Sequence, residues 1–219
     1  MKNFASSYDR KPGHYFAGAR KRFVDELPEN KNGRLLEIGC GNGDTAAYAL
    51  ACRKCGWCAG VELCPEPAAE AATKLNEVIV GDIEEIELPY ADEHFNAVII
   101  SEVLEHLLDP WSVLRKVYRV LKPDGLVLSG SPNVSHYSVL ISLLRGRWDY
   151  EPVGIMDRTH LRWFTPATYR EMFEECGFIV EHVGPALPLR VKAKWLNRIT
   201  FGRLSHLFHT QIYLKARRK

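Results

Sequence analysis

A glycine-rich turn between a hydrophobic run and a helical pattern constrains this chain more than any other feature. Residues 34–38 (RLLEI) form a predicted buried strand, and the residues after it read GCGNGDT, with a helix expected from about Asp44. Asp44 or Thr45 is expected to cap this helix, whose free N–H groups face the turn. The turn contains Gly39, Gly41 and Gly43. Glycine lacks a Cβ, so a ligand can approach this backbone closely, at the carboxyl edge of an open α/β sheet.

The rest of the chain alternates between strand and helix patterns. The predicted strands cover residues 34–38, 57–62, 78–80, 95–101, 126–129, 178–183 and 211–216, and the predicted helices cover residues 45–53, 68–75, 110–121, 138–144 and 167–176. A turn is expected at residues 122–125. This alternation predicts an α/β fold with a doubly wound, mostly parallel seven-stranded sheet and helices on both faces, as in Rossmann-like proteins.

The length of 219 residues favours a single domain over residues 1–219. Three of its parts differ from the α/β pattern: an N-terminal helical cap (1–30), a polar and aromatic excursion after the fifth strand (131–164), and a basic amphipathic segment (185–210). Such a long excursion is expected to form a lid or substrate wall. In the N-terminal part, Tyr8 and Tyr15 either pack against the domain or close over a ligand.

Composition and the apolar pattern bound the class of protein. Hydrophobic residues make up 46% and charged residues 26% of the chain, as in ordinary globular proteins. The first ten residues contain no apolar core of a secretory signal, and no run reaches the roughly 18 apolar residues of a membrane span. We therefore expect a cytoplasmic protein with reduced cysteines.

The net charge of +2 conceals an asymmetry along the chain. No Asp or Glu follows Glu181, whereas nine of the 29 Lys and Arg residues do, which leaves 20 basic against 27 acidic residues before that point. The basic amphipathic segment, residues 185–210, is expected to pack on the domain or to rest on anionic lipid. No dedicated nucleic-acid motif is present, so no nucleic-acid partner is expected.

Acidic residues end the predicted strands at the edge where a ligand would lie. Glu62 ends the second strand, 19 positions after Gly43, where a carboxylate can accept both hydroxyls of a ribose. Asp82 follows the third strand and can accept a hydrogen bond from an exocyclic amine such as that of adenine. With Glu37 and Glu102 at the same edge, this charge disfavours a pyrophosphate and suits a ligand with positive charge.

Several motifs in order make a resemblance specific. They are LEIGCGNG (36–43), GDI (81–83), FNAV (95–98), SEVLEHL (101–107) and LKPDG (121–125). Together they resemble the class I S-adenosylmethionine-dependent methyltransferases, in the branch that acts on small molecules, over residues 34–129. The segment 132–148 also resembles the methionine-biosynthesis protein W family, so that motif alone does not identify a substrate.

The resemblance implies S-adenosylmethionine as cofactor and S-adenosylhomocysteine as product. In this family the glycine turn meets the methionine part of the cofactor, the residue at Glu62 binds the ribose, and the residues at Asp82 and Ile83 meet the adenine. The implied cofactor-binding residues are Glu37, Gly39, Cys40, Gly41, Asn42, Gly43, Glu62, Leu63, Asp82, Ile83, Ser101, Glu102 and His106. Glu37 could instead orient the loop by hydrogen bonding, and His106 could instead cap or pack its helix.

Methyl transfer to a hydroxyl is helped by a general base, for which three histidines are candidates: His106, His136 and His160. A mechanism without a dedicated base also remains open. O-methylation is the expected reaction, with sugar, quinone-like and lipid-linked acceptors all possible. His160 lies in the polar and aromatic cluster DRTHLRWF (157–164), and His136 follows the fifth strand.

Two other functions are compatible with parts of the sequence. A dinucleotide-dependent dehydrogenase would use a Gly-x-Gly-x-x-Gly or Ala turn, which Gly41, Gly43 and Ala46 match weakly. The later motifs count against it. A non-catalytic or regulatory member of the methyltransferase fold would act through a protein partner, but the intact cofactor positions favour an enzyme.

A cluster of cysteines raises the possibility of a metal site. Cys52, Cys55, Cys58 and Cys64 have spacings that invite an iron–sulfur interpretation. The extended stretch between Cys58 and Cys64 would separate them by about 17–20 Å, too far for one cluster. A zinc site at Cys52, Cys55 and Cys58 is a minor alternative, and the expected catalytic site contains no metal.

Overall fold

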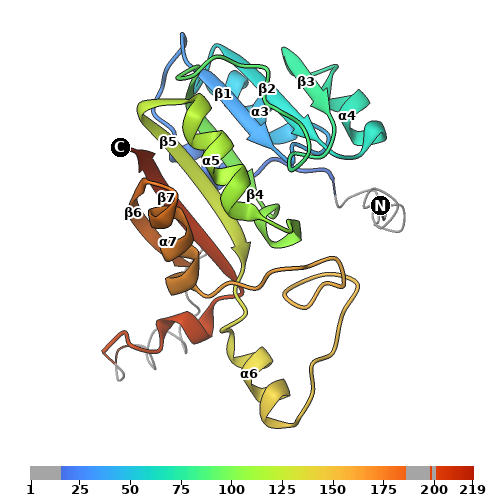
Figure 1. Ribbon diagram of the computed structural model, residues 1–219, viewed down its shortest axis with the longest axis vertical. Helices are drawn as coiled ribbons and strands as arrows, with labels where there is room; N and C mark the ends of the chain where they lie inside the picture. The colour runs from blue at the N-terminus through green and yellow to red at the C-terminus, as the bar shows by residue number, and fades with distance from the viewer. Residues whose placement is uncertain (1–15, 186–197, 199–200) are drawn as a thin grey trace.

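The computed structural model describes residues 16–185, 198 and 201–219. Its elements follow the predicted alternation of strands and helices (Figure 1). In order they are α2 (Lys21–Asp25), β1 (Arg34–Ile38), α3 (Asp44–Ala51), β2 (Trp57–Glu62), α4 (Pro65–Ala71), β3 (Glu77–Val80), β4 (Phe95–Ser101), η2 (Leu104–His106), α5 (Pro110–Val120), β5 (Leu121–Pro132), α6 (Tyr137–Leu144), α7 (Pro166–Glu175), β6 (Phe178–Pro185), η3 (Ser205–Phe208) and β7 (Gln211–Arg218).

The strands form one seven-stranded sheet in the order β3-β2-β1-β4-β5-β7-β6. Strands β1 to β5 pair in parallel, and β7 lies antiparallel between β5 and β6. The prediction of a mostly parallel, doubly wound sheet is therefore confirmed. The order turns back at β1 and β4, which neighbour each other although β2 and β3 intervene in the chain. Ligands bind at such a switch point, beyond the carboxyl ends of the strands.

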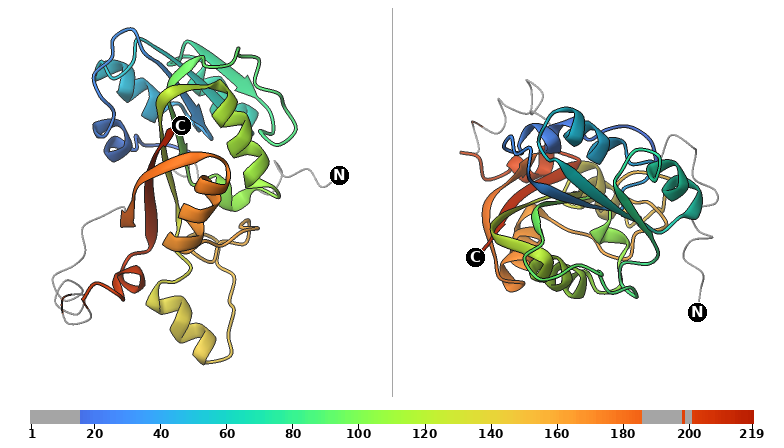
Figure 2. Two further views of the ribbon diagram at one scale, coloured as in Figure 1. Left: turned by 60° about the vertical axis from the view of Figure 1, so that its left-hand side comes forward. Right: turned by 90° about the horizontal axis from the view of Figure 1, so that it is seen from above.

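Helices cover both faces of the sheet, as the view from above shows (Figure 2). The side chains of β1 alternate between two cores: Leu36 and Ile38 pack with α5 and α7, whereas Leu35 packs with α2 and α3. Alternation follows from the period of two along a strand, and burial on both faces explains the continuous apolar run of β4. The sheet thus has a hydrophobic core on each of its two faces.

Helix α5 confirms the predicted start at Asp109 and Pro110. The Asp109 carboxylate accepts a hydrogen bond from the Ser112 N–H, and proline occupies the first helical position. Helix α7 begins with a capping box in which Thr165 and Thr168 bond each other's backbone.

Helix α4 corrects the predicted range of 68–75. It begins at Pro65 because Cys64 is the N-cap residue and Pro65 fits the first helical position. The helix ends at Ala71, with Ala72 as the C-cap residue. The alanine-rich pattern identified the helix but not its ends.

Strand β5 is longer at both ends than the predicted 126–129. Leu121 already pairs with Phe95, and the expected turn at 122–125 lies within a register shift before Leu126 pairs with Ala97. At the other end, β5 continues to Pro132 because β7 supplies an antiparallel partner. The excursion therefore begins at Asn133 rather than at residue 131.

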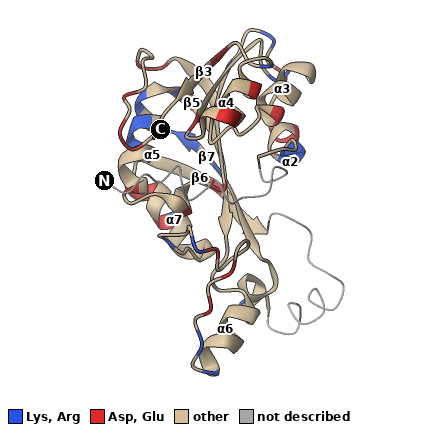
Figure 3. Ribbon diagram, turned by 90° about the vertical axis from the view of Figure 1, so that its right-hand side faces the viewer, with Lys and Arg blue, Asp and Glu red and all other residues tan. Residues whose placement is uncertain are grey.

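The excursion projects from the end of β5, beyond the body of the domain (Figures 1 and 3). Its helix α6 confirms the predicted helix over 138–144. Leu140, Ile141, Leu143 and Leu144 of α6 are all exposed, with 87% of Leu144 accessible.

Within the described part of the chain, no helix is both long enough and apolar enough to cross a bilayer.

Two predicted segments lie partly outside the described residues. Of the N-terminal cap, Tyr8 and Tyr15 are not described, and the described part contains only the short helix α2. Of the basic segment 185–210, the structure describes residues 185, 198 and 201–210, where Phe201 is 92% exposed.

Candidate functional site

The glycine turn after β1 requires glycine at two positions. Gly39 and Gly41 have φ angles of 71° and 51°, in the left-handed region. A Cβ at Gly39 would lie 2.4 Å from Cγ2 of Val103, and a Cβ at Gly41 would lie 2.5 Å from the Phe16 carbonyl oxygen. The turn therefore packs against Val103, which follows β4, on one side and against Phe16 on the other.

The start of α3 differs from the predicted cap. Neither Asp44 nor Thr45 caps the helix; Gly43 is the N-cap residue and offers no side chain. Instead, Oε2 of Glu37 accepts a hydrogen bond from the Ala46 N–H at 3.0 Å. Burial raises the pKa of Glu37 to about 8, against the opposing effect of hydrogen bonds from Thr45 and Ala46. Glu37 thus orients the turn, and it also lines the cavity described below.

Glu62 ends β2 and is 6% exposed. Its Oε2 accepts from the Gly41 N–H at 2.8 Å and its Oε1 accepts from the Cys64 N–H at 2.9 Å. Burial raises the pKa of this carboxyl, while these backbone donors lower it. Since each carboxylate oxygen has a second lone pair, Glu62 can still accept two ligand hydroxyls. The backbone hydrogen bonds hold it in position to do so.

Asp82 lies in the loop after β3. Its Oδ1 accepts from the Glu84 N–H at 2.9 Å, which orients the carboxylate. The neighbouring Ile83 is buried, and its carbonyl accepts from the Lys116 ammonium. The two residues therefore place an acceptor and an apolar surface side by side.

The segment after β4 carries a strained residue. Glu102 has a φ of 57°, which costs energy for a residue with a side chain and is typical of functional sites. Its N–H donates to the Gly130 carbonyl at 2.9 Å. Burial raises the pKa of Glu102, and the positive charge of Arg20 lowers it.

These residues line one cavity of about 240 Å³ at the carboxyl edge of the sheet. The predicted cofactor residues in its lining are Glu37, Gly39, Cys40, Gly41, Glu62, Leu63, Asp82, Ile83, Ser101, Glu102 and His106. The lining offers carboxylates that can accept from ribose hydroxyls and an amine, an apolar surface, and a glycine backbone that a ligand can approach closely. These features together fit an adenosine-containing cation such as S-adenosylmethionine.

Two predicted cofactor residues lie outside this lining, and their contacts give the reason. Asn42 donates its N–H to the Phe16 carbonyl at 3.0 Å. A Cβ at Gly43 would lie 3.0 Å from Cβ of Ala71, so this glycine permits close packing of α3 against α4. The pattern of three glycines did not separate these structural positions from those that line the cavity.

Sequence reasoning missed the segment 16–20, which crosses the glycine turn and also lines the cavity. The Gly18 N–H donates to Asp44 Oδ2 at 2.7 Å, and the Arg20 N–H donates to Thr45 Oγ1 at 3.2 Å. Arg20 adds a cation to an edge that the sequence presents as acidic. The aromatic residues near the N-terminus pointed to this region, but nothing in the sequence identified Arg20.

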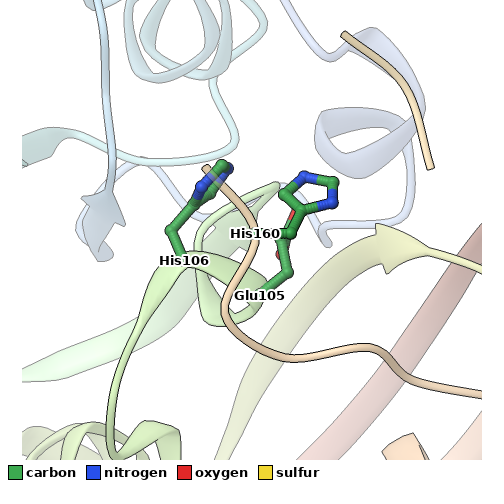
Figure 4. Close-up of side chains that lie close together, drawn as sticks. All are labelled: Glu105, His106 and His160. Atoms are coloured by element: carbon green, nitrogen blue, oxygen red, sulfur yellow. The ribbon is translucent and has the colours of Figure 1, made fainter. Parts of the chain in front are cut away.

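Two of the three candidate bases reach the cavity. His106 and His160 line it, and their ring centroids lie 4.8 Å apart (Figure 4). His136 instead forms the N-cap of α6, where Nδ1 accepts from the Ser138 N–H, and it is not among the lining residues. His136 was a candidate because it follows the fifth predicted strand. Strand β5 extends to Pro132, further than predicted, and His136 lies outside the cavity lining.

Two acidic residues beside these histidines were not predicted. Glu105 and Asp157 line the same end of the cavity and are 1% and 3% exposed. Burial and the nearby charge of Glu102 raise the pKa of Glu105 well above its ordinary value. Both residues lie in segments that the sequence singled out, 101–107 and 157–164, so neighbouring motif residues were the available signal.

The cysteines do not gather into a site. None of the six forms a disulfide, and the one group of three or more potential metal ligands among the described residues contains no cysteine. Cys55 and Cys58 are buried, and Cys58 lies within β2. No group of potential metal ligands among the described residues therefore supports the alternative of a zinc site at Cys52, Cys55 and Cys58.

A family described as a methyltransferase domain matches residues 8–183 of the chain. The chain is 33% identical over 115 residues to 27-O-demethylrifamycin SV methyltransferase of Amycolatopsis mediterranei (strain S699), a match that covers 50% of this chain and 42% of that protein. It is 28% identical over 182 residues to ubiquinone biosynthesis O-methyltransferase of Aeromonas salmonicida (strain A449), covering 78% of this chain and 73% of that protein. The chain thus spans less than half of the first relative and about three quarters of the second.

The fold is also similar to solved structures. A structure of a SAM-dependent methyltransferase from Archaeoglobus fulgidus superposes with a TM-score of 0.66 at 20% identity, covering 94% of this chain and 97% of that one. At this identity the likeness shows a shared fold alone.

Proposed function

The chain belongs to the class I S-adenosylmethionine-dependent methyltransferases, and from that premise we propose that it methylates an oxygen atom of a small-molecule acceptor. S-adenosylmethionine is the cofactor of this family and supplies a methyl group activated by its sulfonium. The observation that carries the proposal is one cavity whose lining includes Glu62 and Asp82, on the β2 and β3 side of the sheet, and also His106 and His160, on the β4 side. Of the two relatives named above, one is an O-methyltransferase by name and the other is named as the methyltransferase of 27-O-demethylrifamycin SV.

The cofactor would occupy the end of the cavity built on the sheet. In this proposal Glu62 accepts the ribose hydroxyls, Asp82 accepts from the adenine amine, and Ile83 lies against the adenine ring. The glycine turn, with Glu37, Ser101 and Glu102, holds the methionine part. Support comes from the backbone hydrogen bonds that orient Glu62 and Asp82 and from the net acidic edge, which suits a cation.

The acceptor would enter at the end formed by the excursion, residues 133–164. Alignment of the acceptor oxygen with the methyl group is the main contribution of the protein, and such positioning can supply roughly 7–11 kcal/mol. His106 or His160 would take the proton from the acceptor hydroxyl. Their shared position in the cavity lining supports this role, whereas His136 lies outside it.

We propose a single domain over residues 1–219 in which the excursion acts as the acceptor wall. Two backbone N–H groups, of Leu161 and Arg162, donate to the Glu105 carbonyl at 2.8 and 2.9 Å and tie the excursion to η2. These contacts support one functional unit rather than a detached lid.

A peripheral membrane contact and a cytoplasmic location stay proposals. The exposed apolar face of α6, with Arg145 and Arg147 after it, and the exposed Phe201 in the basic segment support contact with anionic lipid. No nucleic-acid partner is proposed. Cosedimentation with anionic vesicles tests the membrane contact: binding that weakens with salt supports it, and recovery in the supernatant at low salt refutes it.

Calorimetry and a labelled methyl group test the proposed function. We expect S-adenosylhomocysteine to bind the native chain, and label from S-adenosylmethionine to reach a hydroxylated sugar, a quinol or a lipid-linked acceptor. Absence of any cofactor binding would refute the proposal. Tight cofactor binding without label transfer to any acceptor would favour a regulatory member that acts through a protein partner.

A further inference from the structure

Three potential metal ligands converge at the acceptor end of the cavity. Glu105 and His106 come from η2, and His160 comes from the excursion (Figure 4). One ligand atom from each residue lies within 4.8 Å of the others. Glu105 and His160 are 1% and 6% exposed, so the cluster lies in the interior rather than on the surface.

In both histidines one ring nitrogen contacts a backbone carbonyl oxygen. Nδ1 of His106 lies 3.1 Å from the Thr159 carbonyl oxygen, and Nδ1 of His160 lies 3.0 Å from the Ile155 carbonyl oxygen. A carbonyl only accepts hydrogen bonds, so each Nδ1 carries a proton, and in the neutral form of each ring Nε2 can serve as a metal ligand. A backbone carbonyl bound to the second ring nitrogen is the usual partner of a metal-ligating histidine.

The carboxylate of Glu105 provides the independent observation. Its Oε2 accepts from the Ser131 hydroxyl at 3.1 Å. Its Oε1 is buried and has no hydrogen-bond partner within the described part of the chain. An unpartnered buried carboxylate oxygen is costly, and a bound cation removes that cost.

We propose that Glu105, His106 and His160 bind a divalent metal ion of the zinc class. Two imidazole nitrogens and one carboxylate oxygen are a common donor set for such an ion, with a further coordination position left open. Ligand atoms around a tetrahedral zinc lie about 3.3 Å apart, so the three side chains draw together slightly on binding.

The ion also gives a role for the cluster, and this step rests on the proposed function. All three ligands line the cavity, so the open position lies where an acceptor oxygen would approach. A metal-bound hydroxyl has a lowered pKa and releases its proton to water more readily. The histidines then hold the ion, and neither needs to act as the base.

Titration with Co²⁺ of protein stripped by a chelator tests the site. We expect a single ion with the visible bands of nitrogen and oxygen coordination and no thiolate charge-transfer band. Glu105→Gln and His160→Ala should each weaken binding roughly 100-fold or more, and Ser131→Ala roughly 10-fold. His182→Ala and Cys52→Ser are matched controls outside the cluster and should leave the affinity unchanged.

The same preparations separate this proposal from the proposed function. Each variant is first shown by calorimetry to bind S-adenosylhomocysteine, which establishes that it is folded. Absence of Co²⁺ and Zn²⁺ binding to the native chain overturns the metal site, as does binding that both cluster variants retain or that Cys52→Ser abolishes. If the native chain does not bind S-adenosylhomocysteine, the proposed function is overturned instead.

Discussion

The two ends of the cavity are built in different ways. At the cofactor end, the carboxylates of Glu37, Glu62 and Asp82 each accept a backbone N–H from a neighbouring turn or helix. At the acceptor end, the excursion contributes His160 and Asp157 and carries a helix whose apolar side chains face outward. Strands and the turns after them therefore position the donor side, whereas the proposed acceptor side depends on an excursion that contains one helix with an exposed apolar face. Such a division lets one fold keep its cofactor while its acceptor varies.

The first prediction breaks the cofactor end alone. Glu62→Ala removes the proposed acceptor for two ribose hydroxyls and leaves the N–H groups of Gly41 and Cys64 without the carboxylate that accepts from them. Two hydrogen bonds to a charged group are worth about 3–6 kcal/mol, so the affinity for S-adenosylhomocysteine should fall roughly 100- to 10,000-fold. Calorimetry measures this, with the exposed Glu66→Ala of α4 as control. An affinity within a few-fold of native would contradict the assignment.

The second prediction breaks the acceptor end alone. His160→Ala should lower kcat roughly 100-fold, whether the ring takes a proton or holds an ion. The affinity for S-adenosylhomocysteine should stay near native because His160 lies at the opposite end of the lining from Glu62. Steady-state kinetics with calorimetry separate the two effects, and His182→Ala serves as control. A variant that loses cofactor affinity and kcat together would show that the two ends are not independent.

The third prediction concerns the pH dependence of the cofactor end. The pKa of Glu37 is about 8 in the folded chain against an ordinary value of 4.5, so the folded state binds this proton more tightly. Stability is therefore fully present below the ordinary pKa and falls as pH rises toward 8, by up to about 1.4 kcal/mol per pH unit.

Glu37→Gln should flatten this decline, so the free energy of unfolding of the variant should increase relative to that of the native chain as pH rises. Urea unfolding across that pH interval measures it, with Glu66→Gln as control. An equal slope in the native chain and the Glu37→Gln variant would refute the assignment of the shift to Glu37.

The smallest expected effect contrasts the sheet with the excursion directly. Leu144→Ser changes an 87% exposed side chain and should alter the free energy of unfolding by less than about 0.5 kcal/mol. Leu128→Ala, in the buried part of β5, should cost about 2–5 kcal/mol. Chemical denaturation compares the two. A large loss of stability in Leu144→Ser would mean that α6 packs against the domain in solution.

The strands and the order of the motifs were predictable because periodicity and turn residues act locally. Residues 34–38, 57–62 and 95–101 were predicted with the bounds that the structure gives. The ends of β5 were not, since they depend on pairing with β4 and β7, strands distant in the sequence. A local pattern contains no information about such partners.

The same distinction holds for the site. Glu62 and Asp82 follow strands, so the parallel sheet brings them together in a predictable way. Arg20 and Asp157 reach the cavity through loops, whose course no periodicity describes. Glu105 was not predicted as a site residue because its burial beside His160 depends on how the excursion packs against η2.

A structure of the chain with S-adenosylhomocysteine bound tests the central claim most directly, that one cavity holds the donor at the sheet edge and the acceptor at the excursion. We predict that the ribose hydroxyls lie on Glu62, the adenine amine lies at Asp82, and the sulfur faces the end formed by His106 and His160. A product bound outside this cavity, or with its sulfur turned away from the two histidines, would contradict the account.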